Sequence, residues 1–182
     1  AARRGAEVTL IAANVALPTP AGVLRIDVES AGQLAHAAAE EFQKTHVLLM
    51  AAAPADFRAA DVSAGKLARA DGLELKLEPT EDILASLAAQ RHEGQTVIGF
   101  AAEHGGDAVA RARAKLSRKN ADLIVLNDVS DPAIGFESAD NAVTLIGAEG
   151  ETELPIASKD QIAEAILARV EELRAEAAQP AG

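Results

Sequence analysis

Val47-Leu48-Leu49-Met50 is an unbroken apolar run that leads directly into the small residues Ala51-Ala52-Ala53. A run of this length without polar alternation is typical of a strand that is buried on both faces in a parallel sheet. Before it, Ser30 and Gln33 match the capping box of a helix start, and apolar residues at helical spacing continue to Phe42. A helix that leads into a buried strand indicates an α/β fold.

The same alternation of strand and helix patterns continues on both sides of this stretch. Strands are predicted at 8–11, 23–28, 73–77, 96–101, 123–126 and 142–146, and helices at 80–89, 107–119 and from Ser158, where a second capping box opens a long terminal helix. This order predicts a doubly wound α/β fold with a mostly parallel sheet, helices on both of its faces, and long loops at the carboxyl ends of the strands.

Length and composition favour one folded domain. The chain has 182 residues, of which 49% are hydrophobic and 25% charged, as in soluble folded proteins. We assign the domain to residues 1–174 and expect the Ala-rich stretch 175–182 to be a frayed tail. Aromatic residues are only 2%, which nearly excludes stacking of single-stranded nucleic acid on aromatic side chains.

The charge balance and the residue types that are missing narrow the functional classes further. Lys and Arg number 17 against 28 Asp and Glu, and the net charge of −11 repels nucleic acid and anionic membranes, so neither is expected as a partner. The absence of cysteine excludes disulfides and thiolate chemistry, and it favours a cytoplasmic location. The four His residues lack metal-ligand spacing, so we assign no protein metal site.

Two predicted loops are longer than the two to six residues usual in α/β connections. They cover 52–71 and 128–141, and each follows a predicted buried strand. Ligands of open α/β sheets bind beyond the carboxyl ends of strands, so these loops are the first candidates for a site. Asp56 and Lys66 lie in the first loop, although a single charged residue in a loop is more often a solvated surface group.

The predicted helix 107–119 carries a local excess of positive charge. Five of the 17 cationic residues lie within nine positions: Arg111, Arg113, Lys115, Arg118 and Lys119. Most of them share one helix face, which could grip a polyphosphate. Cations near a helix C-terminus also balance the helix dipole, so both interpretations stay open.

Two strand ends carry further candidate residues. Phe100 follows the small residue Gly99, and it could stack on a base or fill the core. Asn127-Asp-Val-Ser130 ends a predicted buried strand with polar groups that either bind a ligand or fix the next loop. The chain has neither Gly-x-Gly-x-x-Gly nor a Walker A loop, and it lacks Gly-x-Ser-x-Gly and tyrosine, so the commonest dinucleotide, hydrolase and Tyr-dependent dehydrogenase motifs are missing.

In combination and in this order, these segments resemble one known family, the phosphopantothenoylcysteine synthetases (phosphopantothenate-cysteine ligases) of bacterial coenzyme A biosynthesis. The matching segments run from Gly5 to Lys159 and are specific as an ordered set: Ala16-Leu-Pro-Thr-Pro20, Ala51-Ala-Ala-Pro-Ala-Asp-Phe-Arg58, Gly99-Phe-Ala-Ala-Glu103, Ala114-Lys-Leu-Ser-Arg-Lys119, Asn127-Asp-Val-Ser130, Gly135-Phe136, Asp140-Asn141, Leu154-Pro155 and Ser158-Lys159.

The resemblance implies a Rossmann-like fold, a homodimer in which partner chains contribute to each site, and a two-step reaction. CTP activates the carboxylate of 4′-phosphopantothenate as an acyl-cytidylate, and L-cysteine then displaces CMP. Mg²⁺ is expected on the triphosphate. In bacteria the domain is usually fused to a decarboxylase, and FMN would belong only to that fused domain.

The resemblance also assigns nucleotide-binding residues by position. Lys66 matches the first lysine of a loop that closes over the reacting phosphate, and it is the catalytic candidate. The other matching positions are Met50, Ala51 and Ala52 with Asp56 near the cytosine, the segment Glu81-Asp82-Ile83-Leu84, Phe100 beside the nucleotide, and Lys115 and Lys119 on the triphosphate.

Four departures keep other functions open. The closing loop reads Lys66-Leu-Ala-Arg69 where the family has Lys-Ile-Lys-Lys, Glu81 stands for Pro, and Pro54 stands for Val. Ala1–Gly5 resembles the end of a helix closed by glycine, and the family's Gly-rich segment would lie before it. A truncated or non-catalytic nucleotide-binding module is therefore the alternative, and an NAD-linked oxidoreductase is a third candidate that no motif supports.

Overall fold

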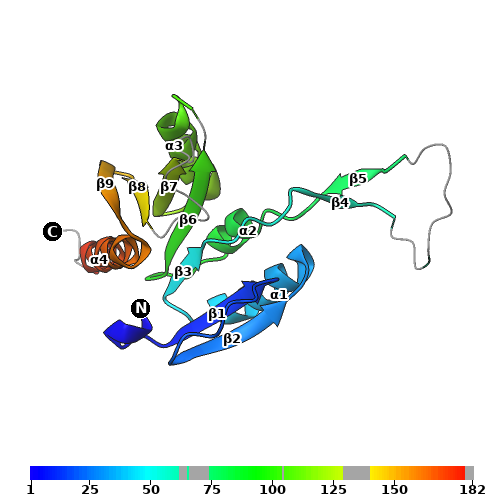
Figure 1. The fold of residues 1–182 in the computed structure, drawn as a ribbon, viewed down its shortest axis with the longest axis horizontal. Helices are drawn as coiled ribbons and strands as arrows, with labels where there is room; N and C mark the ends of the chain where they lie inside the picture. The colour runs from blue at the N-terminus through cyan, green and yellow to red at the C-terminus, as the bar shows by residue number, and fades with distance from the viewer. Residues whose placement is uncertain (62–64, 66–73, 104, 129–139, 179–182) are drawn as a thin grey trace.

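The computed structural model describes all residues except 62–64, 66–73, 104, 129–139 and 179–182 (Figure 1). Its strands are β1 Val8–Ala13, β2 Val23–Val28, β3 Val47–Met50, β4 Phe57–Ala59, β5 Leu77–Pro79, β6 Thr96–Glu103, β7 Leu123–Asp128, β8 Asp140–Gly147 and β9 Gly150–Ser158. Its helices are the short 3₁₀ helix η1 Ala2–Arg4 and the α-helices α1 Ala31–Phe42, α2 Ile83–Ala89, α3 Ala108–Lys119 and α4 Lys159–Ala177.

The strands form one five-stranded sheet and two separate pairs. The large sheet has the order β3-β6-β7-β8-β9; its first three strands are parallel, and β8 and β9 are antiparallel. Strands β1 and β2 pair in parallel with each other, and β4 and β5 form an antiparallel arm (Figure 1). The predicted α/β class with a mostly parallel sheet and flanking helices is confirmed, although β1 is not hydrogen-bonded to β3.

Both faces of the central sheet are buried by alternating side chains. Leu123 and Val125 of β7 pack with α4, and Ile124 and Leu126 pack with α3 on the opposite face. This confirms the buried-strand prediction for 123–126. In β3, however, Leu49 is 40% exposed, because β3 is the edge strand of its sheet.

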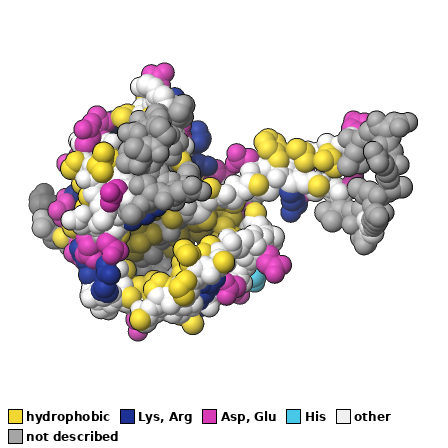
Figure 2. Space-filling model, in the orientation of Figure 1, with side chains coloured by type: hydrophobic (Ala, Val, Ile, Leu, Met, Phe, Trp, Pro, Cys, Tyr) yellow, Lys and Arg dark blue, Asp and Glu magenta, His cyan; other side chains and the backbone are white. Residues whose placement is uncertain are grey.

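A cluster of buried hydrophobic residues joins the β1–β2 pair to the large sheet. It packs α1 and α2 between Val28 of β2, Met50 of β3 and Val97 of β6. Figure 2 shows a hollow with hydrophobic side chains on its walls between the β1–β2 pair and the large sheet. Helix packing, rather than a continuous ladder of hydrogen bonds, therefore holds the two sheets together.

The helix starts follow their side-chain caps. Ser30 and Ser158 form capping boxes with Gln33 and Gln161, as their sequence patterns predict. The N-cap of α2 is Asp82, two residues after Thr80, at which the sequence predicts the start of this helix. The Thr80 hydroxyl instead donates to the Ala55 carbonyl at 2.5 Å and so joins the two strands of the arm at its base.

Other boundaries differ where the pattern is weak. Two strands are not predicted from the sequence. Strand β4 has only three residues, and β9 is largely exposed and contains a bulge opposite Asn141 and Val143. The strand predicted at 73–77 lies at Leu77–Pro79 instead. Helix α4 continues through Ala177, because Ala-Glu-Ala favours helix, so its end lies inside the stretch expected to fray.

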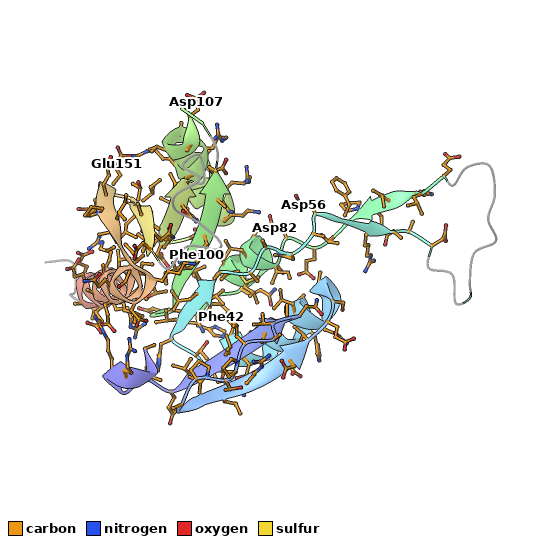
Figure 3. The ribbon with its side chains drawn as sticks, in the orientation of Figure 1. Phe42, Asp56, Asp82, Phe100, Asp107 and Glu151 are labelled. Atoms are coloured by element: carbon orange, nitrogen blue, oxygen red, sulfur yellow. The ribbon has the colours of Figure 1, made fainter. Side chains whose placement is uncertain are left out.

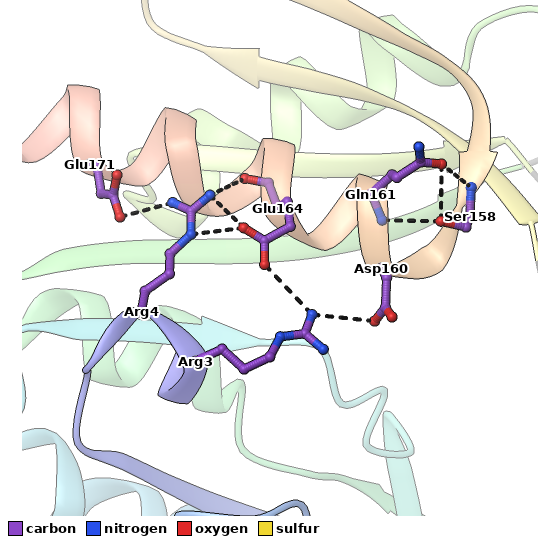
Figure 4. A network of polar contacts seen from close by, with 7 residues as sticks. All are labelled: Arg3, Arg4, Ser158, Asp160, Gln161, Glu164 and Glu171. Atoms are coloured by element: carbon purple, nitrogen blue, oxygen red, sulfur yellow. Dashed lines mark hydrogen bonds and ion pairs between the residues drawn. The ribbon is translucent and has the colours of Figure 1, made fainter.

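Charged contacts attach the start of the chain to α4 (Figure 4). Gly5, at φ 87°, closes η1, as the glycine-terminated pattern predicts. Arg4 contacts Glu164 at 2.7 Å and Glu171 at 2.9 Å, and Arg3 lies 3.6 Å from Glu164. The chain therefore enters β1 from a fixed point beside α4.

Close packing around Gly99 of β6 leaves no room for a side chain, so we expect substitution of Gly99 to lower the stability of the fold. A Cβ atom there would lie 2.7 Å from Leu84 Cδ2 and 2.9 Å from Ile124 Cδ1, both in buried side chains. We expect Gly99→Ala to lower the free energy of unfolding by about 1–3 kcal/mol in urea titrations. Gly32→Ala in α1, where a Cβ meets nothing within 4 Å, should leave it unchanged or raise it by up to about 1 kcal/mol.

Candidate functional site

The candidate site lies where β3 ends beside the middle of β6. Met50, the last residue of β3, pairs with Gly99, so Ala51 and Phe100 are the first residues beyond this ladder. Figure 3 labels Phe100, Asp82 and Asp56 along this side of the molecule, in order from the sheet towards the arm. The carboxyl ends of parallel strands are where open α/β sheets bind ligands.

Lys115 of α3 reaches this edge. Its Nζ atom donates to the carbonyl oxygen of Phe100 at 2.7 Å. Burial, and then the neighbouring charge of Lys119, lower the pKa of Lys115 below its usual value. A partly desolvated cation of this kind interacts strongly with an anion, because less water screens it.

Lys119 lies one turn further along α3 and forms an ion pair with Asp82. Burial alone would raise the pKa of Asp82, but the hydrogen bonds from Lys119 and from the Ala85 N–H outweigh it, and the pKa is lowered. Asp82 is also the N-cap of α2, so one carboxylate both starts α2 and holds the end of α3. Both residues are predicted nucleotide ligands, and the sequence does not predict that they pair with each other.

The other cations of α3 divide between two faces. Arg111 pairs with Glu103 of β6 at 2.7 Å on the side of Lys115 and Lys119. Arg113 points to the other side and lies 3.1 Å from Glu151 of β9. The predicted basic stripe is therefore present, and three of its members, Arg111, Lys115 and Lys119, are held by acidic or carbonyl partners that an incoming polyphosphate would have to replace.

The small-residue turn and the arm complete this edge. Met50 is buried, whereas Ala51, Ala52 and Asp56 are exposed, so the backbone of the turn is accessible. The arm, β4 and β5, leaves the body directly after Asp56 and returns to it before Glu81 (Figure 1). Lys66, the catalytic candidate, belongs to the connection between these strands and lies outside the described residues.

The four residues of the segment 81–84 lie in different surroundings. The side chains of Ile83 and Leu84 are buried in the core, so only their backbone could meet a ligand. Glu81 lines a separate cavity of about 300 Å³ between α1 and α2. Asp82 alone contributes its side chain to the cation cluster at the strand ends.

Two polar side chains to which the family resemblance assigns no role stand out. The side-chain oxygens of Asn127 and Asn141 are buried without a hydrogen-bond partner. The sequence indicates both through polar residues at strand ends, but burial without a partner is visible only in the structure.

Two kinds of feature, a metal-binding cluster and a membrane-spanning helix, are absent from the described residues. In the part of the chain that the structure describes, no group of three or more His, Asp or Glu side chains is placed to hold a metal ion. Within the same residues, no helix is both long and apolar enough to cross a membrane.

Comparison with known proteins now identifies the family. The profile of the DNA/pantothenate metabolism flavoprotein C-terminal domain matches residues 1–173. The chain belongs to this family. The resemblance inferred from the ordered motifs is thereby confirmed, and the site described above lies in a pantothenate-metabolism flavoprotein C-terminal domain.

Individual relatives agree with this assignment. The coenzyme A biosynthesis bifunctional protein CoaBC of Vibrio cholerae is 42% identical over 175 residues, which make up 94% of this chain and 44% of that protein. The chain thus spans less than half the length of this relative. The crystal structure of a CoaBC C-terminal domain has a TM-score of 0.79 at 33% identity and covers 96% of this chain and 78% of the other.

A more distant structure shares the fold of this family. It is a variant of Cab2 in complex with phosphopantothenate-cysteine, with a TM-score of 0.70 at 17% identity, and it covers 87% of this chain and 56% of the other.

The pairing of Asp82 with Lys119 predicts a pH-dependent contribution to stability. Because the folded-state pKa of Asp82 is lowered, its charge stabilises the fold above the unfolded-state value of about 4, and this contribution is lost as the pH falls through the folded value. Asp82→Asn keeps a capping side chain and should cost up to about 1 kcal/mol at pH 7, with the difference vanishing at acid pH once Asp82 is protonated in the folded protein. Urea unfolding at several pH values measures it.

A second variant separates the charge from the cap. Asp82→Ala removes both, so it should cost about 1 kcal/mol more than Asp82→Asn and retain that cost at low pH. A loss for Asp82→Asn that is the same at every pH would contradict a charge contribution from this pair, and equal losses for Asn and Ala would contradict the capping role.

Proposed function

We propose that this domain catalyses the CTP-dependent ligation of 4′-phosphopantothenate with L-cysteine, through an acyl-cytidylate, in coenzyme A biosynthesis. Its family and its CoaBC relatives support a ligase role in that pathway. One structural observation supports the nucleotide in particular: Lys115 and Lys119 lie one turn apart on α3, at Phe100 and Asp82 just beyond the end of β3, in a protein of net charge −11. A local concentration of positive charge in an acidic protein suits a polyphosphate ligand.

The proposed reaction has two displacement steps. A carboxylate oxygen of 4′-phosphopantothenate attacks the α-phosphorus of CTP, and the bond to pyrophosphate breaks. The amine nitrogen of cysteine then attacks the acyl carbon, the bond to CMP breaks, and one proton is released. Both steps build negative charge on phosphate oxygens, which preorganised cations stabilise.

The described residues suggest a role for each cation. Lys115 would hold the triphosphate beside Phe100, and Lys119 would exchange Asp82 for a phosphate oxygen. Phosphate is a stronger hydrogen-bond acceptor for a lysine than a single exposed carboxylate. Mg²⁺ typically binds through substrate phosphates with few protein ligands, so the cation would be held mainly by CTP.

We further propose a homodimer in which the arm contacts the partner subunit. Phe57, Ala59, Leu77 and Pro79 share one face of the arm, and Arg58 and Glu78 form an ion pair on the other. Phe57 is 60% and Leu77 56% exposed, and Figure 2 shows hydrophobic side chains along this projection. A two-stranded ribbon is marginally stable alone, so a partner surface over this apolar face would stabilise it. Lys66, in the connection between β4 and β5, would then reach the partner's site.

Pyrophosphate release tests the ligase proposal. The substrates are CTP or ATP with 4′-phosphopantothenate and Mg²⁺, before and after addition of cysteine, on a polypeptide that contains the family's Gly-rich segment. We expect release from CTP and sustained turnover only with cysteine. If neither nucleotide releases pyrophosphate, the domain is a non-catalytic nucleotide-binding module instead.

Lysine variants test the site itself. Lys115→Met and Lys119→Met should each lower kcat/KM for CTP by about ten- to hundredfold, as expected for loss of a charge-assisted hydrogen bond. Arg113→Met on the opposite face of α3 is the matched control and should stay within about twofold. Equal losses in all three variants would mean that α3 contributes general charge rather than a site.

Sedimentation tests the dimer. The double variant Phe57→Ser with Leu77→Ser should shift the protein from dimer to monomer at micromolar concentration and reduce turnover. Leu24→Ser removes a similarly exposed side chain from β2 and should leave the dimer intact. A wild-type protein that sediments as a monomer, or a variant that remains dimeric, would contradict this use of the arm.

A further inference from the structure

Two amide oxygens remain without partners close to the proposed reaction site. They are Oδ1 of Asn127, near the end of β7, and Oδ1 of Asn141, near the start of β8. Buried polar atoms in folded proteins nearly always have a partner, and an exception at a strand end calls for a ligand or a functional role. Two exceptions in adjacent strands strengthen that inference.

The strand registers place both side chains on one face of the sheet. Asn127 pairs with Val143, which packs against α4 on that face, and opposing residues of a ladder share a face. Asn141 precedes Val143 by two residues, and its own partner Ala157 packs on the same cluster. Asn127 and Asn141 are therefore diagonal neighbours, with Cβ atoms about 7–8 Å apart.

The same face carries the aromatic residue of the candidate nucleotide site. Asn127 pairs on its other side with Ala102, and Phe100 precedes Ala102 by two residues and packs towards α4. Glu103, the next residue of β6, turns to the opposite face and pairs with Arg111 of α3. The two oxygens therefore lie beside the candidate site, on the face of the sheet that packs against α4. The side chain of Glu103 points to the opposite face.

A neutral pair of acceptors suits a particular ligand chemistry. An amine must lose its positive charge before it can attack an acyl carbon, and a nearby carboxylate would stabilise the charged ammonium form. Amide oxygens accept N–H bonds without that penalty. Both residues retain part of their surface exposed, so rotation of each amide would present its oxygen to a ligand at the edge.

We propose that Asn127 and Asn141 bind the amino group of the amine substrate and position its nitrogen for attack on the activated acyl group. This inference rests on the proposed ligase function, in which that amine is L-cysteine. The two asparagines are positioning residues for the second step: a C–N bond forms, the C–O bond to CMP breaks, and one amine proton passes to solvent. They take no part in forming the acyl-cytidylate.

Separate half-reactions test this role. Asn127→Ala and Asn141→Ala should leave pyrophosphate release without cysteine within about twofold, and should raise KM for cysteine about five- to tenfold, as for one lost hydrogen bond. Thr144→Val, on β8 opposite Leu126, is the control and should change neither step. A reduced first half-reaction, or an unchanged cysteine step, would overturn the proposal.

A variant that adds a charge gives a pH profile that would not shift if Asn127 had only a structural role. Asn127→Asp keeps an acceptor of the same shape but adds a carboxylate, which raises the pKa of the bound amine. The pH profile of the cysteine step should therefore shift to higher pH, while the profile of pyrophosphate release stays in place. Coincident profiles for Asn127→Asp and the wild type would contradict an amine at this position.

A binding measurement distinguishes failure of this inference from failure of the ligase proposal. In the wild-type protein, the side-chain amide NMR signals of Asn127 and Asn141 should shift when L-cysteine is added, with or without CTP. Shifts in a protein that never releases pyrophosphate would support the amine site and contradict the ligase. Absence of shifts in an active ligase would contradict the amine site alone.

Discussion

The burial of β6 and β7 on both faces is the constraint on which the rest of the structure depends. Side chains of β7 alternate between α4 and α3, so each helix must lie against its own face of the sheet. This arrangement lays α3 along β6, so that Lys115 reaches the carbonyl of Phe100 just beyond the end of β3. The position of the candidate site follows mainly from packing, because the apolar residues Ala108, Ala112 and Leu116 hold α3 against the sheet.

Local pairing then determines how that site is charged. Asp82 starts α2 and neutralises Lys119, and burial lowers the pKa of Lys115 beside it. The cations of the cluster have protein partners in this structure, and those partners are weaker acceptors than a triphosphate. Exchange of protein acceptors for phosphate oxygens is thus the physical event that the proposed function requires.

Much of the fold could be predicted from the sequence, and the reasons differ by element. β2 and β3 and the two capping boxes were predicted at the observed residues, because apolar runs and Ser-x-x-Gln patterns are strong local signals. β4, β5 and β9 were missed or shifted, because short or exposed strands lack periodicity. The separation of β1–β2 from the large sheet is a long-range property that no local pattern encodes.

The candidate site was predicted less completely than the fold. The basic face of α3 was visible as spacing, and the structure brings Lys115, Lys119, Asp82 and Phe100 together. The sequence did not reveal that Ile83 and Leu84 are core residues, or that Asn127 and Asn141 lack partners, because burial depends on neighbours distant in the chain. The ligand assignment of each residue stays a prediction that a binding measurement must test.

Hydrogen–deuterium exchange with and without CTP and Mg²⁺ tests the central claim most directly. If the nucleotide binds where β3 ends beside Phe100 of β6, exchange should slow in peptides that cover 50–56, 80–85 and 99–103, and should not change in the C-terminal half of α4. Protection confined to the α1–α2 cavity around Gly32 and Ala39, or no protection at any of these strand ends, would contradict the account.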